Sequence, residues 1–308
     1  MSFTETLLLV LAGVYGLVSL LLSTAVAGGW HAGLERRAAT PGELLALRLL
    51  PSAGALLLTL AVVLPAFCRF EPRRETEQAG PLLMALALLA LLAAGHGLVR
   101  GWRAWSATRA LLASCGQANR RVVGGVDIID VAEPLVAAVG GWRPRVLAAH
   151  CVRAACDDEE FQQVIAHEAA HVAAHDNLKL LLLSVAPDPL AWLPAGRSMT
   201  ERWRAAAELE ADARASGHDP RKRAALASAL IKVARLSSAA AHRSAALSMP
   251  VVFDDVQGRV RELLAPFSPR KHLDVRVLLA AALMIAAAAA PLHGLIQEFI
   301  ESLVAVGR

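Results

Sequence analysis

The chain has 308 residues, of which 56% are hydrophobic and only 19% are charged, and its formal net charge at pH 7 is +4. This composition points to a membrane protein, and the length leaves room for one soluble domain besides the membrane part. The modest positive charge flanks apolar segments, so it favours a role in orienting the chain in a lipid bilayer and argues against nucleic-acid binding.

Four apolar stretches are long enough to cross the hydrocarbon core of a bilayer as helices. They span residues 7–28, 49–68, 81–99 and 277–296. No positively charged segment precedes the first stretch, so we expect an uncleaved helix there and not a signal peptide. The predicted domains are three transmembrane helices in 1–100, a polar domain in 101–274, and a fourth helix with a short tail in 275–308.

Lysine and arginine side chains near the predicted spans are distributed unequally between the two sides. Nine lie on one side (Arg36, Arg37, Arg48, Arg100, Arg103, Arg109, Arg270, Lys271 and Arg276) and four on the other (Arg69, Arg73, Arg74 and Arg308). The positive-inside rule then places the 101–274 domain in the cytoplasm and both termini outside.

The 101–274 section has mixed α and β character. A helix is expected over 101–120, and the runs RVVGGVDIIDV, EPLVAAVGG and RPRVLAAHCV predict a small sheet. Further helices are expected over about 221–247 and 255–265. An apolar stretch beside Trp192 either rests on the bilayer surface or packs on the domain. Cys151 and Cys156 beside His150 are expected to be packed thiols, with a metal site as the less favoured alternative.

The run FQQVIAHEAAHVAAHDNLKLLLL predicts one helix from Phe161 to Val185. At about 100° per residue, His167 and His171 lie on one face, one turn apart. Two imidazoles can then bind one metal ion while Glu168 addresses a water molecule beside it, which is the H-E-x-x-H pattern of zinc hydrolases. The alternative is two histidines on a polar helix face without a metal.

A zinc site of this kind needs a third protein ligand. His175 lies on the same straight helix and could not help to surround the ion, and position 174 is Ala, which excludes the metzincin pattern. Downstream, the helical run RWRAAAELEADARA carries Glu208 and Asp212 one turn apart. We therefore expect Glu208 as the third ligand and Asp212 as a partner that orients a ligand histidine.

Together these motifs resemble those of the integral-membrane zinc metallopeptidases of the BlaR/MecR sensor-transducer family, which are related to HtpX-type and prenyl-protein-processing proteases. The matching residues are His167-Glu168-x-x-His171-x-x-x-x-Asp176 and Glu208-x-x-Ala211-Asp212, and the segment 134–147 resembles the strand pair before the zinc helix. The resemblance implies Zn²⁺ as cofactor, Glu168 as general base and a cytoplasm-facing protease in the inner membrane of a bacterial cell. The expected fold is a mainly α membrane protein with four transmembrane helices and a zincin-like α+β domain.

The predicted function is gluzincin-like hydrolysis of peptide bonds in a cytoplasmic or membrane-proximal protein, with a transcriptional repressor in a signalling pathway as one candidate substrate. An edge strand beside the zinc helix is expected to bind extended substrate. Asp176 and Asp212 are expected to orient the ligand imidazoles, and the oxyanion donor is left open among His175, His218, His242 and a nearby arginine.

The alternative function is a catalytically silent signalling or scaffold protein that retains the fold; intact Glu168 argues against it. A transporter is disfavoured because the motif lies outside all four spans.

Overall fold

The computed structural model of the chain describes residues 2–36, 39–70, 80–116, 120–123, 126–131, 133–140, 144–243 and 253–266. The predicted fourth span, 277–296, lies outside the described residues.

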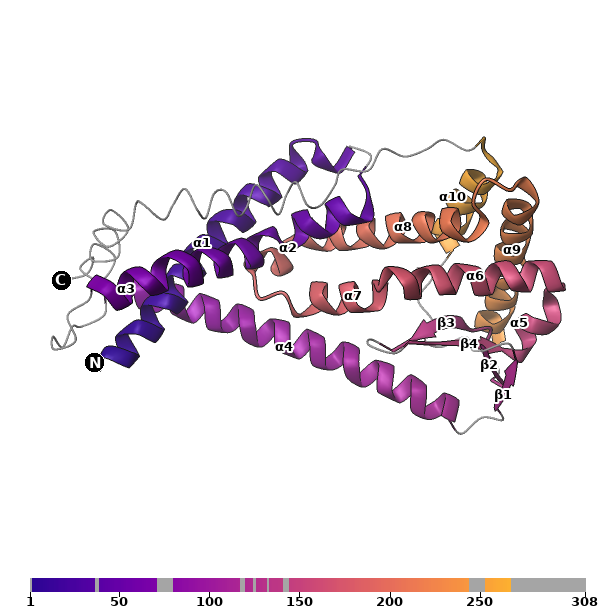
Figure 1. Cartoon of the computed structure of the whole chain (residues 1–308), viewed down its shortest axis with the longest axis horizontal. Helices are drawn as coiled ribbons and strands as arrows, with labels where there is room; N and C mark the ends of the chain where they lie inside the picture. The colour runs from indigo at the N-terminus through magenta and orange to yellow at the C-terminus, as the bar shows by residue number, and fades with distance from the viewer. Residues whose placement is uncertain are drawn as a thin grey trace. The chain divides into compact units, whose positions relative to one another are not determined.

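The described residues are mostly helical, with one small sheet (Figure 1). The elements before the first metal-binding motif are α1 (Phe3–His31), η1 (Leu34–Arg36), α2 (Pro41–Leu58), η2 (Thr59–Val63), α3 (Leu64–Phe70), α4 (Pro81–Gly116), β1 (Arg120–Val123), β2 (Val126–Ile129), β3 (Val136–Val139), β4 (Arg145–Ala149) and α5 (His150–Ala155). Those that follow are α6 (Asp158–Ala174), α7 (Asp176–Val185), η3 (Pro189–Trp192), α8 (Pro194–Ser216), α9 (Pro220–Arg243) and α10 (Phe253–Leu264).

Three described helical segments are long and apolar enough to cross a membrane: Phe3–His31, Pro41–Arg69 and Pro81–Ala113. They contain the first three stretches predicted as membrane spans, and each helical segment is longer than the predicted stretch. The second is continuous through α2, η2 and α3, with a π-helical stretch between the two α-helices. Capping boxes begin α1 at Ser2 and α2 at Thr40, because each side chain accepts a backbone N–H in the first turn.

By its contacts the chain divides into two compact units. Of the described residues, the first unit holds those within Met1–Gly101 and Leu183–Trp203, and the second those within Trp102–Leu182 and Arg204–Lys271. The first unit therefore contains most of the length of the apolar helices together with a segment that lies, in sequence, between the H-E-x-x-H and E-x-x-A-D motifs.

Close helix packing holds the first unit together. Val10, Val14, Val63, Phe67 and Leu83 form a buried apolar cluster. A Cβ atom added at Gly16 would lie 2.2 Å from the backbone oxygen of Leu86, so α1 and α4 approach closely only because position 16 has no side chain.

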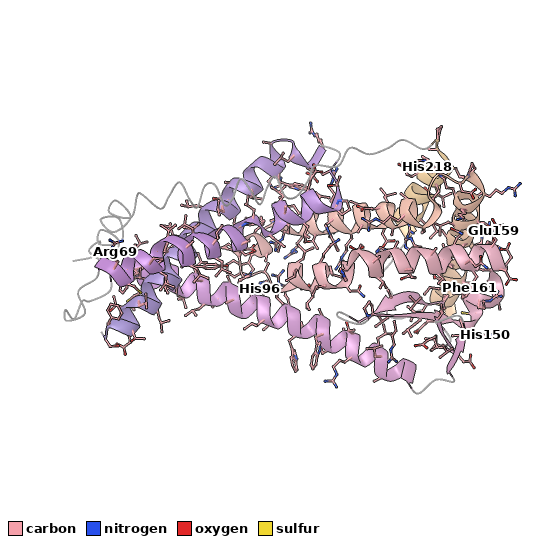
Figure 2. All side chains as sticks on the ribbon, viewed as in Figure 1. Arg69, His96, His150, Glu159, Phe161 and His218 are labelled. Carbon is pink, nitrogen blue, oxygen red and sulfur yellow. The ribbon has the colours of Figure 1, made fainter. Side chains whose placement is uncertain are left out.

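The segment after α7 is fixed to these helices by polar contacts. Both carboxylate oxygens of Asp188 accept from Arg48 Nη1, at 3.1 and 3.2 Å, and both side chains are almost fully buried. Tyr15 donates to the carbonyl of Pro187 at 2.7 Å. Trp192 Nε1 donates to His96 Nδ1 at 2.8 Å, with His96 labelled in Figure 2. The stretch around Trp192 thus packs on the apolar helices.

The second unit contains a four-stranded sheet in the order β1-β2-β4-β3. β2 and β4 are parallel, whereas the β1–β2 and β3–β4 pairs are antiparallel. All three β-rich runs of the sequence form strands, as predicted, and β3 lies at one edge of the sheet. Ile128 and Ala148 on the sheet pack with Phe161 and Ile165 of α6, and Phe161 is labelled in Figure 2.

The predicted single helix from Phe161 to Val185 is wrong in one respect, because it breaks at His175. α6 begins after an Asp157 capping box, has three acidic residues in its first turn, and ends at Ala174. His175 adopts the left-handed conformation with φ of 55°, and α7 begins at the next residue. The break turns Asp176 back toward His171.

Candidate metal centre

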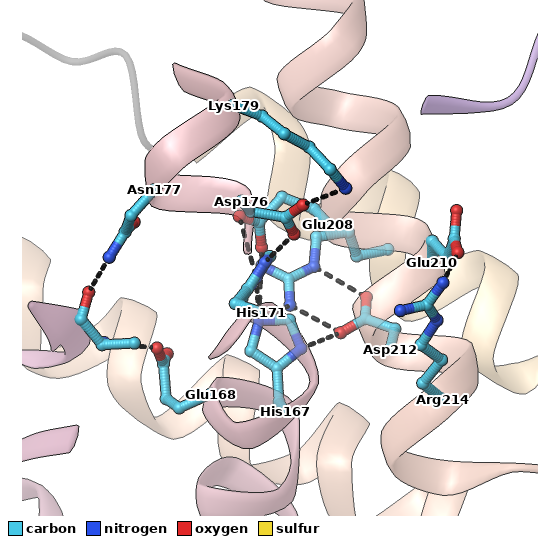
Figure 3. Close-up of polar contacts among 12 residues, drawn as sticks. His167, Glu168, His171, Asp176, Asn177, Lys179, Glu208, Glu210, Asp212 and Arg214 are labelled. Carbon is cyan, nitrogen blue, oxygen red and sulfur yellow. Dashed lines mark hydrogen bonds and ion pairs between the residues drawn. The ribbon is translucent and has the colours of Figure 1, made fainter. Parts of the chain in front are cut away.

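Three side chains of the second unit converge with their ligand atoms within 4.8 Å of one another: His167 and His171 from α6, and Glu208 from α8 (Figure 3). The two Nε2 atoms are 3.2 Å apart. The carboxylate oxygens of Glu208 lie 3.4 Å from His167 Nε2 and 3.5 Å from His171 Nε2. The structure therefore brings together the three residues predicted as ligands.

These separations fit a bound metal ion. Three ligands at about 2.0–2.2 Å from a tetrahedral zinc ion lie about 3.3–3.5 Å from one another. Two imidazoles and one carboxylate are also a donor set that zinc commonly binds. On both distance and chemistry, this group could hold a divalent metal.

A carboxylate lies behind each histidine. His171 Nδ1 is 2.8 Å from Asp176 Oδ2, and His167 Nδ1 is 2.9 Å from Asp212 Oδ1. A carboxylate beside Nδ1 favours the tautomer that has its proton there, which leaves the Nε2 lone pair directed at the shared centre. Asp176 and Asp212 thus lie where the sequence analysis expected them.

The cluster is electrostatically suited to a cation. Burial alone lowers the pKa of His171, but its hydrogen bonds to Asp176 and Glu208 outweigh burial and raise the pKa to about 10. Burial raises the pKa of Glu208, and the contacts with His167, His171 and Arg259 overcome this and lower it well below its usual range. Without a metal, protonated imidazole supplies the positive charge that the carboxylates favour.

Arg259 of α10 is a member of the cluster that sequence analysis did not identify. Its guanidinium donates to both oxygens of Asp212 at 2.8 and 2.7 Å and lies 2.8 Å from Glu208 Oε2. It is only 9% exposed. Arg259 is not part of a sequence motif and lies 92 positions from His167 in the chain, so its position beside the histidine is known only from the fold.

Glu168 faces the edge of the sheet. Its Oε2 accepts the backbone N–H of Ala138 in β3 at 2.7 Å. Asn177, which the sequence analysis also missed, donates to the carbonyls of Ala138 and Gly140 at 2.8 and 2.9 Å. Figure 3 shows both side chains directed at this strand.

The three histidines considered as oxyanion donors lie at or just beyond the ends of helices. His175 is exposed at the break between α6 and α7. His218 lies in the turn between α8 and α9 and is labelled in Figure 2, and His242 falls at the end of α9. Cys156 is buried in an apolar cluster against which Cys151 packs, as expected of packed thiols.

Comparison with known proteins yields one family. A family model described as BlaR1 peptidase M56 matches residues 80–263, more than half of the chain. No curated protein matches, and no solved structure matches.

Proposed function

The chain belongs to the BlaR1 peptidase M56 family of membrane metallopeptidases, and on this basis we propose that it is a zinc endopeptidase of the gluzincin type, with His167, His171 and Glu208 as the metal ligands. The observation that carries the proposal is the 3.2–3.5 Å triangle formed by their ligand atoms. A glutamate as third ligand, supplied by a second helix, gives the gluzincin arrangement.

Zinc bound here would polarise the scissile carbonyl and lower the pKa of a bound water molecule to about 7. Glu168 is placed to act as the base. It neighbours a ligand in sequence, is only partly buried, and lies beside the strand that we propose binds substrate. It takes a proton from the attacking water and delivers it to the departing amine.

The remaining charged residues hold the ligands in place. Asp176 orients His171, and Asp212 orients His167. Arg259 fixes Asp212 through two parallel hydrogen bonds, a geometry that gives strong and directional pairing. The same guanidinium touches Glu208, so it limits the rotation of the third ligand.

Substrate binding is proposed at the free edge of β3. An extended peptide can add to such an edge through backbone hydrogen bonds, and the contact between Glu168 and Ala138 puts the base beside that edge. The substrate is a cytoplasmic or membrane-proximal protein, and a transcriptional repressor is one candidate.

We propose that residues 101–274 form the cytoplasmic peptidase domain and that residues 277–296 form a fourth span. Three apolar helices support insertion in a membrane. The unequal distribution of lysine and arginine supports the orientation, with both termini outside.

Metal removal and one ligand variant test the proposal. The purified full chain in detergent should bind about one zinc ion and cleave unfolded casein; a chelator should stop cleavage and added zinc should restore it. His171→Ala should lose the zinc, as measured by elemental analysis. Cleavage that survives complete metal removal, or undiminished zinc in the variant, would refute the proposal.

A further inference from the structure

The hydrogen-bonding groups at the free edge of β3 are occupied by side chains. The carbonyl of Leu135 accepts the N–H of Ala149. Alternate residues 135, 137 and 139 therefore direct their backbone N–H and C=O groups toward β4. Ala138 and Gly140 therefore present their backbone groups to the open side. There Glu168 takes the N–H of Ala138, and Asn177 takes the carbonyls of Ala138 and Gly140.

The left-handed residue at the end of α6 puts Asn177 in this position. A non-glycine residue with φ of 55° is uncommon, and at His175 it ends the helix after one further turn beyond His171. The next two side chains then diverge. Asp176 bonds to the ligand His171, and Asn177 reaches the edge of the sheet.

Asn177 makes the bonds that a substrate strand would make. An added strand donates N–H groups to alternate carbonyls of the edge, and the carboxamide of Asn177 donates its two N–H groups to two such carbonyls. We propose that Asn177 is a gatekeeping residue, whose amide occupies the substrate-binding edge of β3 until an extended segment displaces it. This inference rests on the proposed function, because it assigns a specificity-determining residue to that site.

Displacement also affects Glu168. In antiparallel pairing, the substrate residue opposite Ala138 donates to its carbonyl and accepts its N–H. The same substrate residue therefore displaces the hydrogen bond from Asn177 to the carbonyl of Ala138 and the hydrogen bond from the N–H of Ala138 to Glu168. Binding of an extended segment thus frees the base for proton transfer.

The gate restricts the substrate. Two N–H groups, two residues apart, must replace the amide of Asn177, and proline has no backbone N–H. Segments with proline at either of these positions should bind poorly. Mass spectrometry of casein fragments should show proline depleted at two alternate positions near the cleaved bonds.

Binding to metal-stripped full chain tests the gate without requiring turnover. The probe is fluorescein-labelled β-casein, an unfolded protein, and the readout is fluorescence anisotropy in detergent. Asn177→Ala and the isosteric Asn177→Asp remove the donors and should each bind casein about tenfold more tightly, because two neutral hydrogen bonds no longer compete. Gln162→Ala, which removes an exposed amide from α6, is the matched control and should leave the Kd unchanged.

The zinc-loaded proteins provide a second readout. Both Asn177 variants should lower KM by a similar factor and change kcat little, whereas a purely structural residue would lower kcat when lost. Equal or weaker casein binding by both variants, or no binding by any of the proteins, would overturn the gate. If the variants bind more tightly but no protein cleaves casein, the gate stands and the peptidase proposal fails. If wild type cleaves casein but the variants change neither Kd nor KM, the gate fails and the peptidase proposal stands.

Discussion

Each of the two histidines proposed as metal ligands has a carboxylate beside its Nδ1 atom, but the two carboxylates differ in their surroundings. Asp212 is 2% exposed and is shared between His167 and Arg259, whereas Asp176 also pairs with Lys179 at 3.0 Å. Loss of charge at Asp212 would leave a buried guanidinium without its main partner, so we expect His167 to be more sensitive to its carboxylate than His171.

Asp212→Asn should therefore lower zinc affinity or activity about 10–100-fold. The carboxamide keeps the size of the side chain but removes the charge that holds both His167 and Arg259. Zinc titration against a competing chelator would measure the loss. The control is Glu210→Gln on the same helix. Among the contacts described, Glu210 pairs only with Arg214, so this variant should bind zinc like wild type. Equal affinities in the two variants would contradict the role of Asp212.

Zinc binding should release protons. In the metal-free protein the pKa of His171 is raised to about 10, so its imidazole is protonated at pH 8 and must lose that proton to bind metal. Apparent zinc affinity should then rise with pH up to about 10 and fall as pH is lowered. Calorimetry at pH 8 in buffers of different ionisation enthalpy should give about one proton or more per zinc. Binding without proton release would contradict a protonated His171 ligand in the metal-free protein.

At the scale of the elements, the segment that connects α6 to α8 packs closely against α4. A Cβ atom added at Gly97 of α4 would lie 2.4 Å from the backbone oxygen of Val185, at the end of α7. Backbone cannot move aside as a flexible side chain can, so α4 depends on glycine at this position. Two residues earlier, Gly95 has nothing within 4 Å of an added Cβ.

Gly97→Ala should destabilise the protein by about 1–3 kcal/mol through overpacking. Gly95→Ala on the same helix should be neutral or stabilise by up to about 1 kcal/mol, because alanine is a better helix former than glycine. Thermal unfolding of both variants in one detergent provides the comparison. Similar midpoints for the two variants would mean that α4 and α7 do not approach as closely as described.

The sequence predicted those elements whose signal is local. Hydropathy predicted the three long apolar helices, and the four-residue spacing between His167 and His171 predicted the helix face on which both imidazoles lie. The break at His175 was missed because a long helical pattern continues through it, and no glycine marks the residue that adopts the left-handed conformation. The pairing of Arg48 with Asp188 joins residues 140 positions apart, so the place of the segment after α7 could not be predicted either.

Arg259 and Asn177 were missed for the same reason. Arg259 lies on an ordinary amphipathic helix, and its contacts with the site, to Asp212, Glu208 and His167, join residues at least 47 positions apart in sequence. Asn177 follows Asp176 directly, but its role depends on a strand about 40 residues earlier. Glu208 and Asp212 could be predicted although they lie on another helix, because their spacing forms a motif that follows H-E-x-x-H in the chain, whereas Arg259 and Asn177 belong to no such motif.

At the scale of the whole molecule, orientation in the membrane is the next prediction. A reporter that is active only in the cytoplasm should work when inserted after Gly217, and the same reporter should be inactive when fused after Arg308. The expectation rests on nine lysines and arginines on one side of the predicted spans against four on the other. The opposite pattern of reporter activity would reverse the topology and place the metal centre outside.

The most direct test of the peptidase proposal is the rate of casein cleavage by wild type and Glu168→Gln at equal zinc content. Glutamine keeps the size of the side chain and can still accept the N–H of Ala138, but it cannot take a proton from water. The variant should retain about one zinc per chain and cleave about 10²–10⁴-fold more slowly, the usual contribution of general-base catalysis. Equal cleavage rates would show that Glu168 is not the base, and zinc-loaded wild type that cleaves nothing would favour a silent scaffold.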